Sequence, residues 1–281
     1  VASESNSPEL RMATLPILAR LSPDQALPVL SNMISNGTPV EQQAAYLAIA
    51  ELNHPEAATL LIQGLKTLGQ GELPYLAQVE LLDAAEASDD ATVQTAMAKL
   101  QEQWAASGDP LASFRGSLSG GNPRAGWRLF NEHAVLACTR GHRANGEGGY
   151  ACPDRTGLAD RVSAEYMLES ITTPNATIAE GFDVVAFTLS NGGYEVGVMA
   201  EKTADHITIY DAAGEKKSFA ANHVTERAGA PFSMPAIFGL VVKRNELREL
   251  MTLLQSLTAE NHKEDQKPHP NQHQTKLNHK Y

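Results

Sequence analysis

Apolar residues recur at helical spacing in the first hundred residues and at strand spacing later in the chain. Between residues 7 and about 106, segments such as SPELRMATLPILARL and TPVEQQAAYLAIAEL place apolar side chains three and four positions apart, which predicts amphipathic helices. Each segment is followed by a short turn and a second helical segment. Ser7-Pro8 and Thr38-Pro39 each place a capping hydroxyl before a proline, which favours a helix start.

These predicted helices come in pairs that repeat along the chain. The turn prolines Pro23 and Pro55 lie 32 residues apart. A repeat length in the thirties with two helices per unit is typical of an α-solenoid. Residues 1–106 are therefore predicted to form helical repeats that resemble HEAT repeats, with an irregular helical bundle as the alternative.

The rest of the chain is predicted to form a second domain of mixed structure. A stretch rich in Gly, Ser and Pro at 107–121 indicates a linker. Helical patterns then resume, and at about 182–228 the period changes to two in five short segments. The expected fold class is mainly α: an α-solenoid, then at 122–257 a helical domain carrying a small β-barrel or β-sheet insert. Residues 258–281 are predicted to be a polar, disordered tail.

Composition narrows the classes of protein that fit. The chain has 42% hydrophobic residues and a net charge of −11, with no apolar run long enough to span a membrane. Nucleic-acid binders usually carry a basic patch, so we expect no nucleic-acid partner. The sequence begins with Val and enters a helical pattern almost at once, so we expect it to be a piece of a longer protein.

Candidate chemistry is concentrated in the segment FNEHAVLACTRGHRANGEGGYACPDRTGLADR. Covalent haem attachment normally uses Cys-x-x-Cys-His, in which two thiols join the haem vinyl groups and the histidine becomes an axial ligand. Here Cys138 and His142 have the required separation, but Gly141 stands in place of the second cysteine. Alone, this pair is a weak signal.

The surrounding residues make the signal specific. The blocks GWRLF, CTRGH, GEGG, PDRTGLADR, YMLESITTPNATIAEGF, GVMAEKTADHITI and SMP occur in this order over about 120–257. In this region the chain resembles the haem-binding cytochrome c domain found at the C-termini of large planctomycete and verrucomicrobial proteins, which often follows helical repeats. The resemblance also implies a small β-unit before the Met-Pro pair.

The resemblance implies a set of haem-binding residues. Cys138 would form a thioether to haem c, His142 would be the proximal ligand, and Met234 would be the distal ligand. The backbone carbonyl of Pro153 would lie next to the His142 ring and fix its tautomer.

Three positions depart from the family pattern. Gly141 replaces a cysteine, Cys152 replaces a glycine, and Arg155 replaces an apolar residue. Cys152 can supply the second thioether, pair with Cys138 in a disulfide, or remain a buried thiol, and the sequence leaves these alternatives open. Arg155 fits a haem site if it reaches a propionate or solvent.

The expected function is electron transfer by a c-type cytochrome domain rather than catalysis. The domain would exchange electrons with a redox partner protein or with a missing catalytic domain of a larger, dehydrogenase-like protein. Attachment of this kind places the protein in the periplasm or otherwise outside the cytoplasm. The main alternative is a haem-less, degenerate cytochrome fold that acts as a protein-interaction module, and a third is a haem domain with an open sixth position.

Overall fold

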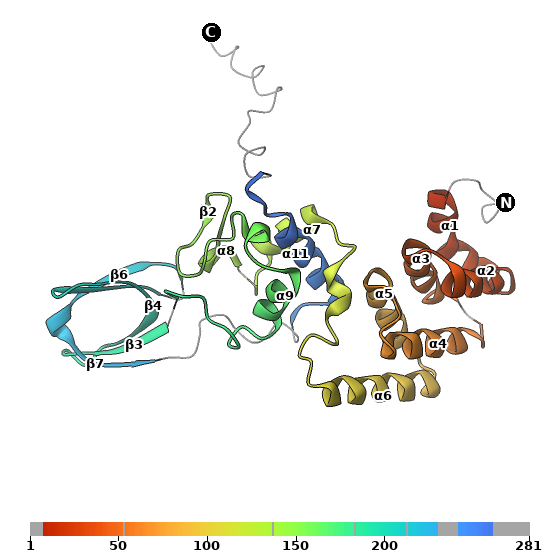
Figure 1. Cartoon of the computed structure of the whole chain (residues 1–281), viewed down its shortest axis with the longest axis horizontal. Coiled ribbons are helices and arrows are strands. Elements are labelled where there is room, and N and C mark those ends of the chain that lie inside the picture. The colour runs from red at the N-terminus through yellow and green to blue at the C-terminus, as the bar shows by residue number, and fades with distance from the viewer. Residues whose placement is uncertain are drawn as a thin grey trace, which may run out of the picture. The chain divides into compact units, whose positions relative to one another are not determined.

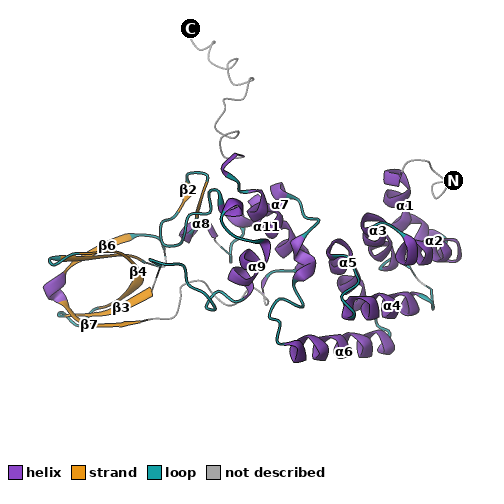
Figure 2. Ribbon diagram, viewed as in Figure 1, coloured by secondary structure: helices purple, strands orange, loops and turns teal. Residues whose placement is uncertain are grey.

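The computed structural model describes residues 8–52, 54–136, 138–182, 184–211, 213–229 and 241–260. As the sequence predicted, the described part is mainly helical with a small antiparallel sheet (Figures 1 and 2). The chain divides into two compact units, one made of 1–122 and 242–251 and the other of 123–241 and 252–281. The division therefore falls inside the last described helix.

Helices build the first unit around a core of leucine and alanine side chains. They are α1 (Pro8–Leu21), α2 (Pro23–Asn36), α3 (Pro39–Ile49), α4 (Ala57–Gly69), α5 (Tyr75–Glu86), α6 (Ala91–Ser107) and the first part of α11 (Arg244–Ser256). Helix α3 packs against α1, α2 and α5, and α4 packs against α2, α5 and α6. Each of these helices thus contacts helices one and two places along the chain.

Polar caps fix where several of these helices begin and end. The Thr38 side chain accepts a hydrogen bond from the Glu41 backbone N–H, and the Glu41 side chain accepts one from the Thr38 N–H, which completes a capping box. Asp90 caps α6 through the backbone N–H groups of Thr92 and Val93. At the other end of α6, Gly108 takes the left-handed conformation that ends many helices.

The segment predicted as a linker, 107–121, folds onto the first unit. It contains a short 3-10 helix, η1 (Arg115–Leu118), that packs against α5. Ser117 and Leu118 are buried, and a Cβ on Gly116 would lie 2.9 Å from the Gln78 Cβ. The absence of a Cβ at Gly116 thus lets η1 approach α5 closely.

Ion pairs join α5 to the beginning of α11 within the first unit. Arg248 Nη1 lies 2.7 Å from Glu80 Oε1, and the two side chains are each only 10% exposed. Gln43 Nε2 also donates to Glu80 Oε1, at 2.9 Å. Arg244 pairs with Glu86 at 2.6 Å, in a more exposed position. The Glu80–Arg248 pair is therefore part of the buried interior.

Gly64 allows α4 to approach Tyr46 of α3 and Leu81 of α5. A Cβ at position 64 would lie 2.5 Å from the Tyr46 Oη and 2.8 Å from Leu81 Cδ1. Tyr46 is 1% exposed, and burial raises its pKa to about 12. We expect Gly64→Ala to lower the free energy of unfolding by about 1–3 kcal/mol, because overpacking outweighs the gain in helix propensity. Urea unfolding measures this change, and an equally stable Gly64→Ala protein would contradict it.

The second unit combines short helices with the sheet. Its helical elements are α7 (Pro123–Glu132), α8 (Cys138–Gly141), η2 (Leu158–Asp160), α9 (Ala164–Thr172), η3 (Ala221–His223) and the end of α11. Ser163 caps α9 by accepting a hydrogen bond from the Tyr166 N–H. A two-stranded hairpin of β1 (Arg143–Ala144) and β2 (Glu147–Gly148) follows α8.

The five strands predicted at about 182–228 form one antiparallel sheet. They are β3 (Val184–Leu189), β4 (Tyr194–Lys202), β5 (His206–Tyr210), β6 (Lys216–Ala220) and β7 (Val224–Gly229), in the order β6-β5-β4-β3-β7. Val185, Phe187, Ile207 and Ile209 form its core. Because β6 and β7 are the two edge strands, the structure supports the sheet and not the barrel of the two forms expected.

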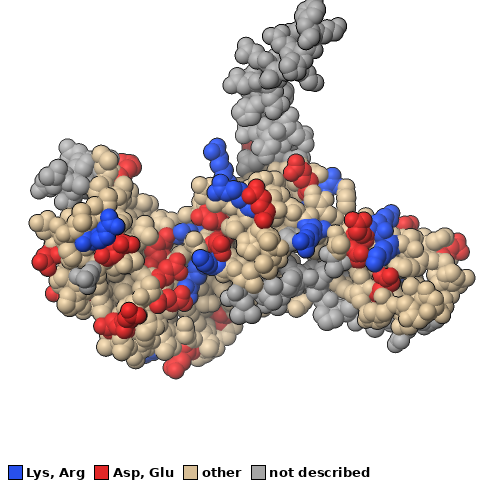
Figure 3. Space-filling view, turned by 180° about the vertical axis from the view of Figure 1, so that it is seen from behind, with Lys and Arg blue, Asp and Glu red and all other residues tan. Residues whose placement is uncertain are grey.

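Two predicted features fall outside the described residues. Met234 lies in 230–240, and 261–281 make up most of the predicted tail. Within the described residues, no helix is both long and apolar enough to cross a membrane. On the face drawn in Figure 3, acidic and basic side chains of the described residues are interspersed.

Candidate functional site

One helical turn places Cys138 and His142 next to each other in space. Helix α8 begins at Cys138 and ends at Gly141, and the His142 backbone N–H donates to the Cys138 carbonyl at 2.8 Å. The four-residue separation in the sequence thus becomes one turn of helix. Both residues lie in the second unit.

The Gly-rich loop after His142 folds back onto α8. The Gly149 N–H donates to the Thr139 carbonyl, and the Cys152 N–H donates to the Gly141 carbonyl, both at 2.9 Å. A Cβ on Gly148 or Gly149 would overlap the carbonyl oxygens of His142 or Arg140. Close approach of the backbone therefore explains Gly148 and Gly149, whereas Gly146 has open space around it and takes a positive φ of 89°.

His142 is a buried, neutral imidazole. The residue is 8% exposed, and its Nδ1 lies 3.0 Å from the Pro153 carbonyl oxygen, which is the contact expected from the sequence. Burial, followed by the charge of Arg155, lowers the pKa of His142 to about 3. The ring is uncharged near neutral pH, as a metal-binding imidazole must be.

Arg155 contacts the same nitrogen of His142. Its Nε lies 3.1 Å from Nδ1, and burial lowers the pKa of the guanidinium. Nδ1 can donate a proton to the Pro153 carbonyl or accept one from Arg155, but not both at once. The first arrangement leaves the lone pair of Nε2 available to a metal, whereas the second puts the ring proton on Nε2. Arg155 therefore influences which tautomer His142 adopts.

Both cysteines are partly buried and lie in the segments that surround α8. No disulfide joins them in the described structure, so the disulfide weighed from the sequence is not present. Burial raises the pKa of the Cys138 thiol to about 11. A Cβ on Gly141 would lie 2.8 Å from the Cys152 Sγ. The sulfur of Cys152 thus lies beside the position where the usual second cysteine would begin its side chain.

The raised pKa of Cys138 predicts slow alkylation in the haem-free protein. At pH 8 we expect iodoacetamide to modify Cys138 on the order of 100 times more slowly in the folded protein than in urea, because only the thiolate reacts. Labelling should accelerate about tenfold per pH unit as pH rises toward 11. Mass spectrometry of the Cys138 peptide measures the rate. Equal rates in folded and unfolded protein would show that the thiol is not protected.

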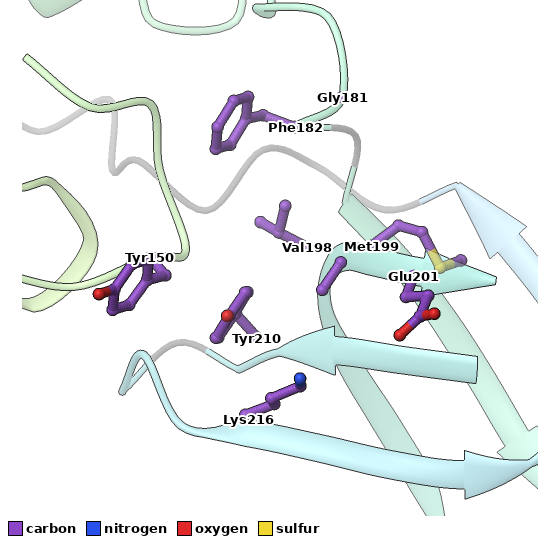
Figure 4. Close-up of a pocket in the computed structure, with 9 residues that line it drawn as sticks. Tyr150, Gly181, Phe182, Val198, Met199, Glu201, Tyr210 and Lys216 are labelled. Atoms are coloured by element: carbon purple, nitrogen blue, oxygen red, sulfur yellow. The ribbon is translucent and has the colours of Figure 1, made fainter. Parts of the chain in front are cut away.

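The sheet also contacts the Gly-rich loop, which the sequence did not suggest. The Tyr150 ring stacks on that of Tyr210 at a centroid distance of 6.0 Å, and the Arg143 guanidinium lies 4.8 Å from the Tyr150 centroid. Beside this contact is an open pocket of about 280 Å³ that Tyr150 shares with Phe182 and the β4–β6 region (Figure 4). In the sequence, this contact was indicated by the aromatic Tyr150 within the Gly-rich stretch.

The structure brings together most of the residues singled out from the sequence. Cys138, His142, Cys152, Pro153 and Arg155 form one cluster around α8. Met234 is outside the described residues, so its position relative to His142 remains a prediction. Among the described residues, no three His, Cys, Asp or Glu side chains gather as a metal site.

A comparison of the sequence with models of protein families finds no match, and a search of curated proteins finds no significant match. The function is therefore argued from the chemistry of the cluster around α8.

Proposed function

We propose that the second unit is a c-type cytochrome domain that transfers electrons. The observation that carries the proposal is His142, a buried neutral imidazole one helical turn after Cys138, with Nδ1 beside the Pro153 carbonyl. A histidine held at one ring nitrogen by a carbonyl presents the other nitrogen to a metal in a fixed orientation. In this proposal the fold is that of a cytochrome c domain with an inserted sheet.

The residues around α8 fit a covalently held haem. Bound haem iron supplies one-electron oxidation and reduction. Cys138 would provide a thiol for attachment, and His142 and Met234 would provide one nitrogen and one sulfur ligand, a pair that favours a high reduction potential. The Pro153 carbonyl holds the proton on Nδ1. Arg155 must release Nδ1 for this tautomer to form, and its guanidinium is then available to pair with an anionic group such as a propionate.

The first unit serves as a scaffold in this proposal. Its helices contact partners one and two places along the chain, which supports a repeat arrangement of the HEAT type. The electrons would come from a catalytic domain of a larger protein or from a separate redox partner. Because haem is attached in this way outside the cytoplasm, we place the protein in the periplasm or another extracytoplasmic compartment.

The second candidate is a haem-less interaction module, and Arg155 favours it. With the Arg155 Nε–H donating to Nδ1 at 3.1 Å, the ring proton sits on Nε2 and His142 is unsuited to bind iron. In that case the cluster is the remnant of a haem site, and the helices and sheet bind other proteins.

A pyridine haemochrome spectrum separates the two candidates. The protein is expressed with a periplasmic haem-attachment system, extracted with acid–acetone, and measured beside a Cys138→Ala/Cys152→Ala control. The cytochrome proposal predicts haem that remains with the protein after extraction and is lost from the control. A colourless protein would contradict it and favour the interaction module.

A further inference from the structure

We propose that Cys152 supplies the second thioether to haem, in place of the cysteine that is missing at position 141. The inference rests on the proposed cytochrome function and adds to it the route of attachment. The second thiol would reach the haem from the loop that follows the histidine, rather than from the residue that precedes it.

The position of the Cys152 sulfur carries the inference. It lies 2.8 Å from the point where a Cβ of residue 141 would stand, which is closer than two non-bonded heavy atoms approach. The sulfur thus occupies space that a side chain at 141 would need. Gly141 and Cys152 are therefore a matched pair: the glycine leaves the space, and the cysteine fills it with the same functional group.

Backbone hydrogen bonds hold the loop that carries Cys152 against α8. The Cys152 N–H donates to the Gly141 carbonyl at 2.9 Å, and three residues earlier the Gly149 N–H donates to the Thr139 carbonyl, also at 2.9 Å. Cys152 is partly exposed and forms no disulfide with Cys138. Its backbone is thus held at the end of α8, and its sulfur lies beside residue 141.

Thioether formation needs only the thiol and a haem vinyl group. The Cys152 sulfur forms a bond to the vinyl carbon nearest the ring, the vinyl π bond breaks, and the thiol proton goes to the terminal carbon. The addition neither consumes nor releases electrons overall. Cys138 reacts in the same way with the other vinyl group.

Trypsin provides a direct test, because arginines separate the two cysteines. Cleavage after Arg128, Arg140, Arg143 and Arg155 releases Cys138 in the peptide 129–140 and Cys152 in the peptide 144–155. In haem-loaded protein we expect one species in mass spectrometry that contains both peptides and haem. The pyridine haemochrome α band should lie at the position for two saturated vinyl groups.

Two variants make the test decisive. Cys152→Ala should leave haem on the 129–140 peptide alone and move the α band to longer wavelength, as one unsaturated vinyl group dictates. Gly141→Cys/Cys152→Ala rebuilds Cys-x-x-Cys-His and should restore two thioethers. In the haem-free protein, Gly141→Cys should destabilise the fold more when Cys152 is present than when Cys152 is alanine.

The failure of this inference differs from the failure of the proposed function. Haem on the 129–140 peptide alone, with Cys152 alkylated as an ordinary thiol, overturns the second thioether and leaves the cytochrome intact. A colourless parent contradicts the cytochrome function and the inference together. A coloured Gly141→Cys/Cys152→Ala variant beside it would then show that the pocket holds haem only when the usual motif is rebuilt.

Discussion

Arg248→Met is expected to lower the free energy of unfolding of the first unit by about 3–5 kcal/mol, because it leaves a buried carboxylate without its cation. Arg248 and Glu80 lie 2.7 Å apart and are each 10% exposed, so water cannot replace the lost partner well. Gln43 would remain as a neutral donor to Glu80 at 2.9 Å. One amide hydrogen bond does not offset the desolvation of a charge.

Tryptophan fluorescence measures this loss in the first unit alone. The chain has two tryptophans, so Trp127→Phe leaves Trp104 as the reporter of that unit. The double variant Glu80→Met/Arg248→Met should recover most of the stability, since it removes both charges. Arg244→Met breaks the more exposed pair with Glu86 and should cost about 1 kcal/mol or less. If Arg248→Met had an effect as small as Arg244→Met, the pair would not be buried in solution.

Acid should destabilise the haem-free second unit through His142. Its pKa is about 3 in the folded protein, against ~6.5 for an unfolded chain, so between these values the unfolded state binds a proton that the folded state does not. The contribution of neutral His142 to the free energy of unfolding is fully present above pH ~6.5 and decreases as pH falls toward about 3. Through this one group, the free energy of unfolding falls by up to ~1.4 kcal/mol for each pH unit.

His142→Gln separates this effect from the titration of carboxylates. With Trp104→Phe in the background, Trp127 reports on the second unit, and urea unfolding is measured between pH 7 and about pH 4.5. The parent should lose stability over this range by more than the variant does. Parallel curves for parent and variant would mean that the imidazole is accessible to protons in the folded state.

Local patterns in the sequence were sufficient for the longer helices and for the five strands of the main sheet, but not for α8, β1 and β2. The β-branched and aromatic residues of 184–189 and 206–210 mark strands, although successive residues in each are buried and burial does not alternate. Thr38 with Glu41 marks a helix start by a bond that spans three residues. The segment 107–121 was harder to interpret. Its Gly and Ser residues suggest a linker, but Gly116 lies where η1 packs closely against α5, a contact that no local pattern reveals.

At the site, too, contacts between residues that are distant in the sequence could not be predicted. The spacing of Cys138 and His142 is a local, helical relation and could be found from the sequence. The contacts of Gly141 with Cys152 and of His142 with Arg155 join residues 11 and 13 positions apart through a folded loop. From the sequence, Gly141 marks the loss of an attachment cysteine. Only the folded loop shows that the sulfur of Cys152 lies beside it.

The division of the chain within α11 has a consequence for the order in which the protein is made. The first unit includes residues 242–251, among them Arg244 and Arg248, although its other residues end at 122. On the ribosome, all of 123–241 is synthesised before Arg244 and Arg248. The ion pairs of Glu86 with Arg244 and of Glu80 with Arg248 therefore form only after most of the second unit has been made. The first unit is therefore completed only after the segment 123–241 has been synthesised.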